Sequence, residues 1–179
     1  PKPSAEIDEV AQKIMAQLKA NGIKVSYDAD PKKRPGFKFA EHEMKGVPVR
    51  VGIGKRDLEK GVVEVARRDT KEKKSIEIDR VAQYIQDLLE EIQINLFQKA
   101  KDFRKDHMHS ADDMNTFKEI IDQQGGFVLA HWDGTVETEL KIKELTKATA
   151  RCIPNDNLQD EGKCILTGKP SKERILFAK

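Results

Sequence analysis

Helical periodicity over residues 79–105 is the feature of this 179-residue chain that most constrains its fold. Apolar residues recur there at the spacing of one helix face: Val81, Ile85, Leu88, Leu89, Ile92, Leu96 and Phe103. A helix of that length extends about 40 Å at roughly 1.5 Å per residue, which is too long for one side of a small domain. We therefore predict that it joins two domains, residues 1–95 and residues 96–179.

The residues before this helix predict an α/β domain. A first helix is expected after Ser4, with its end at Asn21-Gly22. A short helix is expected at residues 37–45 and a charged turn at residues 54–61. Alternating apolar residues predict strands at residues 23–27, 47–53, 62–68 and 75–78. This order predicts a mixed sheet covered by helices.

The residues after the long helix predict a second small α/β domain. A turn is expected at residues 107–110, and helices at residues 114–121 and 135–147. Strands are expected at residues 127–132, 148–153, 163–166 and 174–177. The predicted fold class is therefore α/β, with two small α/β domains joined by a long helix.

Composition excludes several classes of protein. Apolar residues make up 37% and charged residues 36% of the chain, with a net charge of +2. No apolar run approaches the roughly 20 residues of a membrane helix, and the first residues do not resemble a secretory signal. The two cysteines, Cys152 and Cys164, form no disulfide framework. We expect a cytoplasmic protein without a membrane partner.

Cationic, aromatic and acidic residues are densely interleaved within residues 32–61, with no catalytic or phosphate-loop motif. Phe39 and Glu43 are four residues apart and share one face of the predicted short helix. A ring beside a carboxylate is suited to an unstacked base, since the ring stacks and the carboxylate accepts from the base. Arginines suit the acceptor edge of guanine. The alternative is that Phe39 belongs to the core and the charges are solvated.

The order of the letters identifies a family resemblance. "RPGFKFAEHEMKGVPVRVGIGKRDLEKGVVEVARRD", "FRKDHMHSADDMNTFKEII", "GGFVLAHWDGTVETELKIKELTKATARCIP" and "EGKCILTGKPSKERILFAK" follow one another. In this order they resemble prolyl-tRNA synthetase of the archaeal and eukaryote-like type. The resemblance covers nearly the whole chain. It implies an anticodon-binding domain, followed by a small C-terminal domain that is often zinc-binding.

The resemblance also implies a function and a set of site residues. The chain resembles the C-terminal part of a class II ligase that attaches proline to its tRNA. That ligase uses ATP and Mg²⁺ in an upstream catalytic domain, so this chain alone is predicted to be inactive. The first strand of the family's anticodon-binding domain is missing, and the full-length protein is expected to be a homodimer. The family's anticodon contacts correspond to Phe39, Glu43, Arg50, Arg56, Asp57 and Lys73, with Lys71 as the alternative to Lys73.

Two further expectations follow from this resemblance. In zinc-bearing relatives four ligands lie at positions that correspond to Asp133, Thr138, Cys164 and Thr167. Structural zinc needs four thiolate or imidazole ligands, so a single cysteine predicts no bound zinc, with packing and hydrogen bonds in its place. The alternative function is a free-standing tRNA-binding or regulatory paralogue without synthetase activity.

Overall fold

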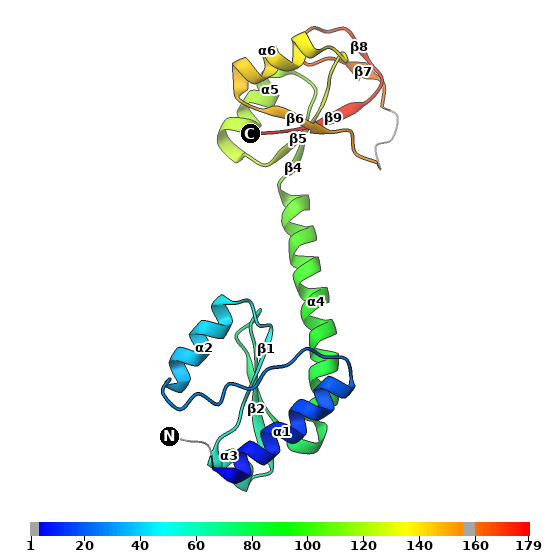
Figure 1. Cartoon of the computed structure of the whole chain (residues 1–179). Coiled ribbons are helices and arrows are strands. Elements are labelled where there is room, and N and C mark those ends of the chain that lie inside the picture. The colour runs from blue at the N-terminus through cyan, green and yellow to red at the C-terminus, as the bar shows by residue number, and fades with distance from the viewer. Residues whose placement is uncertain (1–3, 156–159) are drawn as a thin grey trace. The chain divides into compact units, whose positions relative to one another are not determined.

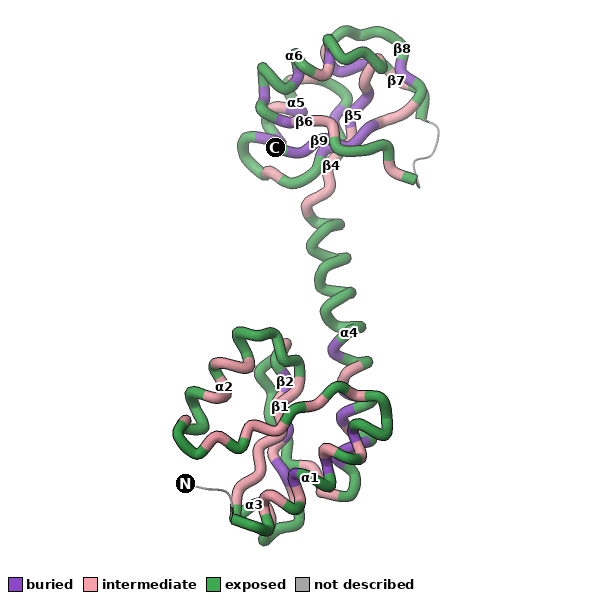
Figure 2. Tube along the Cα trace, in the orientation of Figure 1, coloured by how far each residue is buried: buried purple, intermediate pink, exposed green. Residues whose placement is uncertain are grey.

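The computed structural model describes residues 4–155 and 160–179. The chain divides into two compact units, Pro1–Gln98 and Lys99–Lys179, here called the first and second unit (Figure 1). The boundary falls within α4 (Val81–Asp106), which is exposed throughout its part beyond Ile92 (Figure 2). None of the described helices combines the length and the apolar character needed to cross a membrane.

The first unit consists of a three-stranded sheet and helices. In chain order its elements before α4 are α1 (Ala5–Ala20), α2 (Pro35–Met44), β1 (Val49–Gly52), α3 (Lys55–Glu59), β2 (Val62–Arg67), β3 (Lys73–Glu77) and η1 (Ile78–Arg80). The strands pair in the order β1-β2-β3, and both pairs are antiparallel. The α/β class is confirmed, but the described sheet of the first unit is antiparallel and not mixed as predicted for it; parallel and antiparallel pairs occur together in the sheet of the second unit.

The pleat of β2 divides this sheet into two faces. Val63, Val65 and Arg67 are buried, whereas the residues between them are partly exposed. The buried valines pack against apolar residues of α1 and α4: Ile14, Leu18, Val81, Ala82, Ile85, Leu88 and Ile92. Because successive side chains point to opposite faces, Glu64 and Ala66 lie on the other face, toward α2. That face carries the candidate site.

Two predictions for the first unit were wrong. Residues 23–27 form no strand, although Ile23 and Val25 pack against the core. Alternation predicts burial on one side, but a strand also needs a neighbouring strand for its backbone groups. Residues 54–61 contain α3 in place of a plain turn, because the Asp57 carboxylate accepts from the Gly54 amide at 3.1 Å and closes the first turn.

The second unit has a four-stranded sheet in the order β4-β5-β9-β6. β4 and β5 are parallel, and the other pairs are antiparallel. Phe117 and Phe177 lie edge to face at its core, with ring centroids 5.3 Å apart. Its elements are β4 (Met108–Ala111), α5 (Met114–Glu119), η2 (Ile120–Gln124), β5 (Phe127–His131), α6 (Val136–Thr146), β6 (Thr149–Cys152), β7 (Gly162–Lys163), β8 (Pro170–Ser171) and β9 (Arg174–Ala178). The predicted turn at residues 107–110 is instead β4, because β5 supplies its pairing partner.

The end of α6 yields a stability prediction. Lys147 is the C-cap residue of this helix, and its backbone has the left-handed conformation, with φ of 66°. Its amide donates to the Lys143 carbonyl at 2.8 Å. Glycine adopts this conformation without a steric penalty. Lys147→Gly is therefore expected to raise the free energy of unfolding by about 0.5–1 kcal/mol, measured by urea unfolding. As the control, Lys143→Gly inside α6 should lower it by about 1 kcal/mol; a loss with Lys147→Gly would contradict the prediction.

Candidate nucleic-acid interface

Helix α2 places Phe39 and Glu43 above the exposed face of the sheet. Pro35 occupies its first turn, where no intrahelical amide bond is lost. The Phe39 ring lies against Arg50 of β1, with the Arg50 Cζ atom 3.6 Å from the ring centroid. Arg50 in turn lies 3.5 Å from Glu64 of β2, and the Lys73 amine lies 3.4 Å from the same carboxylate oxygen. The ring and the guanidinium are thus in cation–π contact, and together they offer a base an aromatic and cationic platform.

Glu43 is held by two groups that follow β2. Lys71 donates to the Glu43 carboxylate at 2.9 Å, and Nε of Arg68 donates to the Glu43 carbonyl at 3.0 Å. The hydrogen bond from Lys71 and its charge lower the pKa of the Glu43 carboxyl, and the charges of Arg50 and Arg68 also lower it. Lys71 itself has φ of 65°, a conformation uncommon for a residue with a side chain. Glu43 is therefore a preformed carboxylate acceptor.

A shallow concavity lies between α2 and the sheet. Its lining includes Phe39, Glu43, Arg50 and Arg68, together with His42 and Pro48. It thus combines an aromatic ring, a carboxylate and cationic groups within one site. This combination suits an unstacked base, because the faces of a base stack and its edges carry donors and acceptors.

The predicted site residues fall into two groups. Phe39, Glu43 and Arg50 are brought together at the concavity, and Lys73 reaches the same face through Glu64. Arg56 and Asp57 lie on α3, where Asp57 caps the helix. Within the described residues no hydrogen bond or ion pair joins either of them to the first group.

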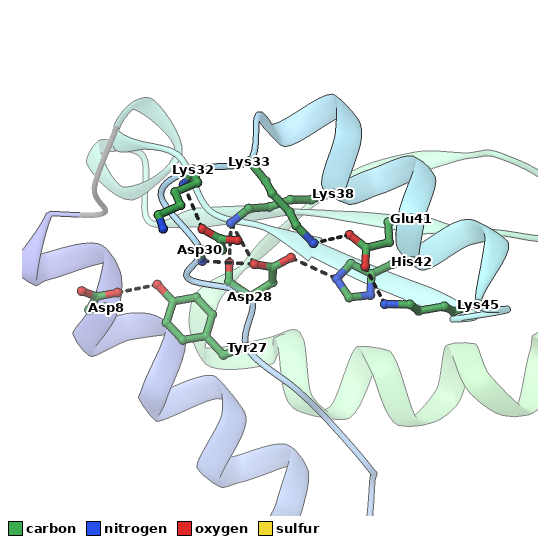
Figure 3. A network of polar contacts seen from close by, with 10 residues as sticks. All are labelled: Asp8, Tyr27, Asp28, Asp30, Lys32, Lys33, Lys38, Glu41, His42 and Lys45. Atoms are coloured by element: carbon green, nitrogen blue, oxygen red, sulfur yellow. Dashed lines mark hydrogen bonds and ion pairs between the residues drawn. The ribbon is translucent and has the colours of Figure 1, made fainter.

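A polar network holds α2 against the preceding loop (Figure 3). Asp28 accepts from Lys38 at 3.0 Å and lies 3.2 Å from His42 Nε2. Lys33 and Lys45 each lie 2.7 Å from Glu41. The hydrogen bond from Lys38 is the main cause that lowers the pKa of the Asp28 carboxyl to about 2. These contacts tie the loop to α2 and position the helix that carries Phe39 and Glu43.

A buried ion pair fixes the end of β2. The Arg67 guanidinium donates to both carboxylate oxygens of Asp69, at 2.8 and 2.7 Å. Arg67 also donates to Glu91 of α4, and Asn95 donates to Asp69 at 2.7 Å. The Arg67 side chain is 8% exposed and that of Asp69 is 3% exposed. Because Arg68 directly follows Arg67, this ion pair also holds the backbone from which the Arg68 side chain extends. The predicted contacts did not include Arg68. Two adjacent arginines at the end of a predicted strand were the feature of the sequence that could have indicated it.

The residues at the positions implied for zinc do not fit that metal. Both Asp133 oxygens accept hydroxyl hydrogens: Thr135 at 2.9 Å, Thr138 at 3.0 Å and Thr167 at 2.9 Å. Burial raises the pKa of the Asp133 carboxyl, but these hydrogen bonds outweigh burial and leave it lowered. Hydroxyls are poor zinc ligands, and Cys164 supplies one thiol. Across residues 4–155 and 160–179, no three His, Cys, Asp or Glu side chains are grouped as metal ligands would be.

A known protein family matches each of the two units. Residues 2–88 match the family described as "Anticodon binding domain". Residues 114–179 match the family described as "Prolyl-tRNA synthetase, C-terminal".

Comparison with individual proteins gives the same result. A proline–tRNA ligase of Porphyromonas gingivalis is 53% identical over 175 residues, which are 98% of this chain and 35% of that protein. One of Cytophaga hutchinsonii is 54% identical over 97% of this chain and 35% of its own length. The solved prolyl-tRNA synthetase of Cryptosporidium parvum, complexed with L-proline and AMP, matches 100% of this chain and 38% of its own, with a TM-score of 0.91 and 31% identity. The chain thus spans about a third of the length of these proteins.

Proposed function

Because the chain corresponds to the C-terminal region of a prolyl-tRNA synthetase, with an anticodon-binding domain, we propose that it recognises the anticodon stem-loop of proline tRNA. The observation that carries the proposal is the concavity of the first unit, where Phe39, Glu43 and Arg50 meet. Stacking on a ring, together with polar contacts to base edges, is how proteins read single-stranded loops of RNA.

The chemistry of guanine supports this assignment. Its Watson–Crick edge carries two donors, N1–H and the N2 amino group, and the ionised Glu43 carboxylate is an acceptor for both. Its O6 and N7 are acceptors that suit guanidinium donors. The proposed contact set is Phe39, Glu43, Arg50, Arg56, Asp57 and Lys73, with Arg56 and Asp57 serving a neighbouring nucleotide from α3. Two guanines shared by proline anticodons fit a site of this kind.

The activity of the whole protein is part of the proposal. The relatives named proline–tRNA ligase are nearly three times as long as this chain, which covers 35% of them. We propose that this chain supplies tRNA recognition in a cytoplasmic, homodimeric ligase, whose catalytic domain uses ATP and Mg²⁺ to attach proline. The chain by itself is then inactive in aminoacylation.

The subtype of the synthetase is a finer proposal than its family. The archaeal and eukaryote-like type expected from the sequence is not supported by the curated relatives, because those reported above are bacterial ligases. The solved structure of the Cryptosporidium parvum protein, which matches the whole chain including the C-terminal unit, speaks in its favour. We keep this type as a proposal.

Binding of the isolated anticodon stem-loop tests the proposal. The chain should bind a stem-loop with the anticodon UGG more tightly than loops in which either guanine is replaced by adenine. Glu43→Gln should reduce this preference by about 1–3 kcal/mol, because an amide cannot accept from both guanine donors. Titration of labelled stem-loops at fixed salt measures both quantities.

The control for Glu43→Gln must also remove one negative charge from the chain. Glu77→Gln serves, since Glu77 is 67% exposed and pairs with Arg80, away from the concavity. It should leave the preference for guanine unchanged. A wild-type chain that binds the UGG and adenine loops equally would refute the proposed function.

A further inference from the structure

We propose that Arg68 reads the O6 and N7 edge of a guanine held beside Glu43, a role that rests on the proposed function and deepens it. The anticodon contacts implied by the sequence do not include this residue. Three observations carry the proposal: the fixed position of Arg68, the lack of an ion pair between Arg68 and any described carboxylate, and its place next to Glu43.

The position of Arg68 is fixed at both backbone and side chain. Its amide donates to the Pro48 carbonyl at 2.9 Å, which joins it to the start of β1. Its Nε donates to the Glu43 carbonyl at 3.0 Å. The guanidinium is planar, so a bound Nε leaves the two Nη groups as a fork of known orientation. A fixed fork can select a base edge, whereas a mobile side chain contributes charge alone.

Arg68 differs from the other cations of the concavity in its ion pairing. Arg67 is paired with Asp69 and Glu91. Arg50 lies against Phe39 and near Glu64, and His42 lies near Asp28. Among the ion pairs of residues 4–155 and 160–179, none includes Arg68. Its Nη groups can therefore engage a ligand without breaking an existing ion pair.

Arg68 and Glu43 complement the two edges of guanine. Both line the same concavity, and the charge of Arg68 contributes to the lowered pKa of the Glu43 carboxyl. Glu43 accepts from N1–H and the N2 amino group, while the Arg68 fork donates to O6 and N7. Adenine offers a donor, its N6 amino group, where guanine has O6. Arg50, stacked on Phe39, then belongs to the platform on which the base lies.

Base analogues separate this role from a structural one. The chain, with and without Arg68→Met, is titrated with the UGG stem-loop and with loops carrying 7-deazaguanosine at one guanine or the other. Removal of N7 should weaken binding by the wild-type chain roughly ten-fold at one of the two positions. That penalty should fall below about two-fold in Arg68→Met, because the donor to N7 is gone.

Each remaining outcome has a defined meaning. If Arg68 only caps α2 or contacts phosphate, Arg68→Met weakens every loop equally and the N7 penalty persists, which overturns the inference. The inference also fails if the wild-type chain shows no N7 penalty at either guanine. Loss of the guanine preference itself in the wild-type chain would refute the proposed function as well.

Two further variants guard the experiment. Arg80→Met removes an arginine that is 81% exposed and paired with Glu77, so it should retain the full N7 penalty. Arg68→Lys keeps the charge, and it replaces Arg68→Met if that variant does not fold by urea unfolding. With one donor group in place of a fork, it should show an intermediate penalty; an unchanged penalty would count against the inference.

Discussion

Replacing Asp69 by alanine is expected to lower the free energy of unfolding of the first unit by about 3–5 kcal/mol, because it removes the buried partner of Arg67 and leaves only the mostly exposed Glu91 to pair with that charge. The two side chains are 8% and 3% exposed, and two hydrogen bonds of 2.8 and 2.7 Å join them. The bonds from Arg67 and Asn95, with the charge of Arg67, hold the pKa of the Asp69 carboxyl far below its ordinary range, against the effect of burial. The pair also connects β2 to α4 through Glu91.

Urea unfolding followed by far-UV circular dichroism measures this loss. Asp79→Ala is the matched control, since Asp79 is 87% exposed and its ion pair with Lys13 should contribute less than about 1 kcal/mol. The fluorescence of Trp132, which lies in the second unit and is the one tryptophan of the chain, should report an unchanged transition. A loss of less than 1 kcal/mol for Asp69→Ala would contradict the buried-charge explanation.

A double substitution distinguishes the cost of an unpaired buried charge from the loss of the ion pair itself. Arg67→Met with Asp69→Leu removes both charges and should recover most of the stability lost in Asp69→Ala. It should also weaken binding of the stem-loop, because the backbone before Arg68 loses its support. Failure to recover stability would mean that the ion pair itself, and not the unpaired charge, dominates the loss.

The second large effect is expected at Asp133. Its carboxylate accepts the hydroxyl hydrogens of Thr135, Thr138 and Thr167 and joins β5 and α6 to the turn before β8. Hydrogen bonds to an ionised group contribute more than neutral ones, so Asp133→Ala should lower the free energy of unfolding of the second unit by about 2–4 kcal/mol. Trp132 fluorescence measures it, because the Trp132 indole donates to the Thr135 carbonyl at 3.0 Å within this segment.

Acid should reproduce part of this loss in the wild-type chain. Hydrogen bonds lower the pKa of Asp133 in the folded state, so its contribution is fully present above the unfolded value of about 3.9. It is lost as the pH falls from that value through the folded pKa. Asp133→Ala should therefore show a smaller decrease of stability below about pH 4 than the wild type. An equal decrease would mean that other carboxylates cause it.

Two controls define the Asp133 experiment. Asp122→Ala removes an aspartate of the same unit that is 65% exposed and 3.4 Å from Lys179, and it should cost less than about 1 kcal/mol. A chelator should leave the unfolding midpoint of the second unit unchanged, since hydrogen bonds occupy the place implied for zinc. A lower midpoint in chelator, or zinc retained after purification, would contradict this explanation.

Much of the fold could be predicted from local pattern. The periodicity and caps predict α1, and the helices expected at residues 37–45 and 135–147 correspond to α2 and α6; the structure confirms all three. Two of the errors fall at residues 23–27 and 107–110, where the outcome depended on a strand far away in the sequence. Alternation reports burial, but a ladder needs a second strand: β5 provides one for β4, and none is present for residues 23–27 in the described chain.

The candidate site could be predicted only in part, for a similar reason. Phe39 and Glu43 are four residues apart in one helix, so local geometry places them together. Their neighbours come from other elements: the structure adds Arg68, pairs Lys71, the alternative to Lys73, with Glu43, and leaves Arg56 and Asp57 on α3. Residue type indicates what a side chain can contact, whereas tertiary packing decides which contacts form.

The adjacent residues Arg67 and Arg68 show what the sequence could not predict without the tertiary structure. By itself the sequence predicted most of the helices, the family resemblance, and a strand that ends at two adjacent arginines; the structure ends β2 at the first of them. Only the tertiary structure decided that Arg67 is buried against Asp69, while Arg68 faces the concavity beside Glu43. The physical reason is that Arg67, the last residue of β2, lies on the buried face of the strand, whereas Arg68 begins the turn after it. The surroundings of both residues come from distant segments of the chain.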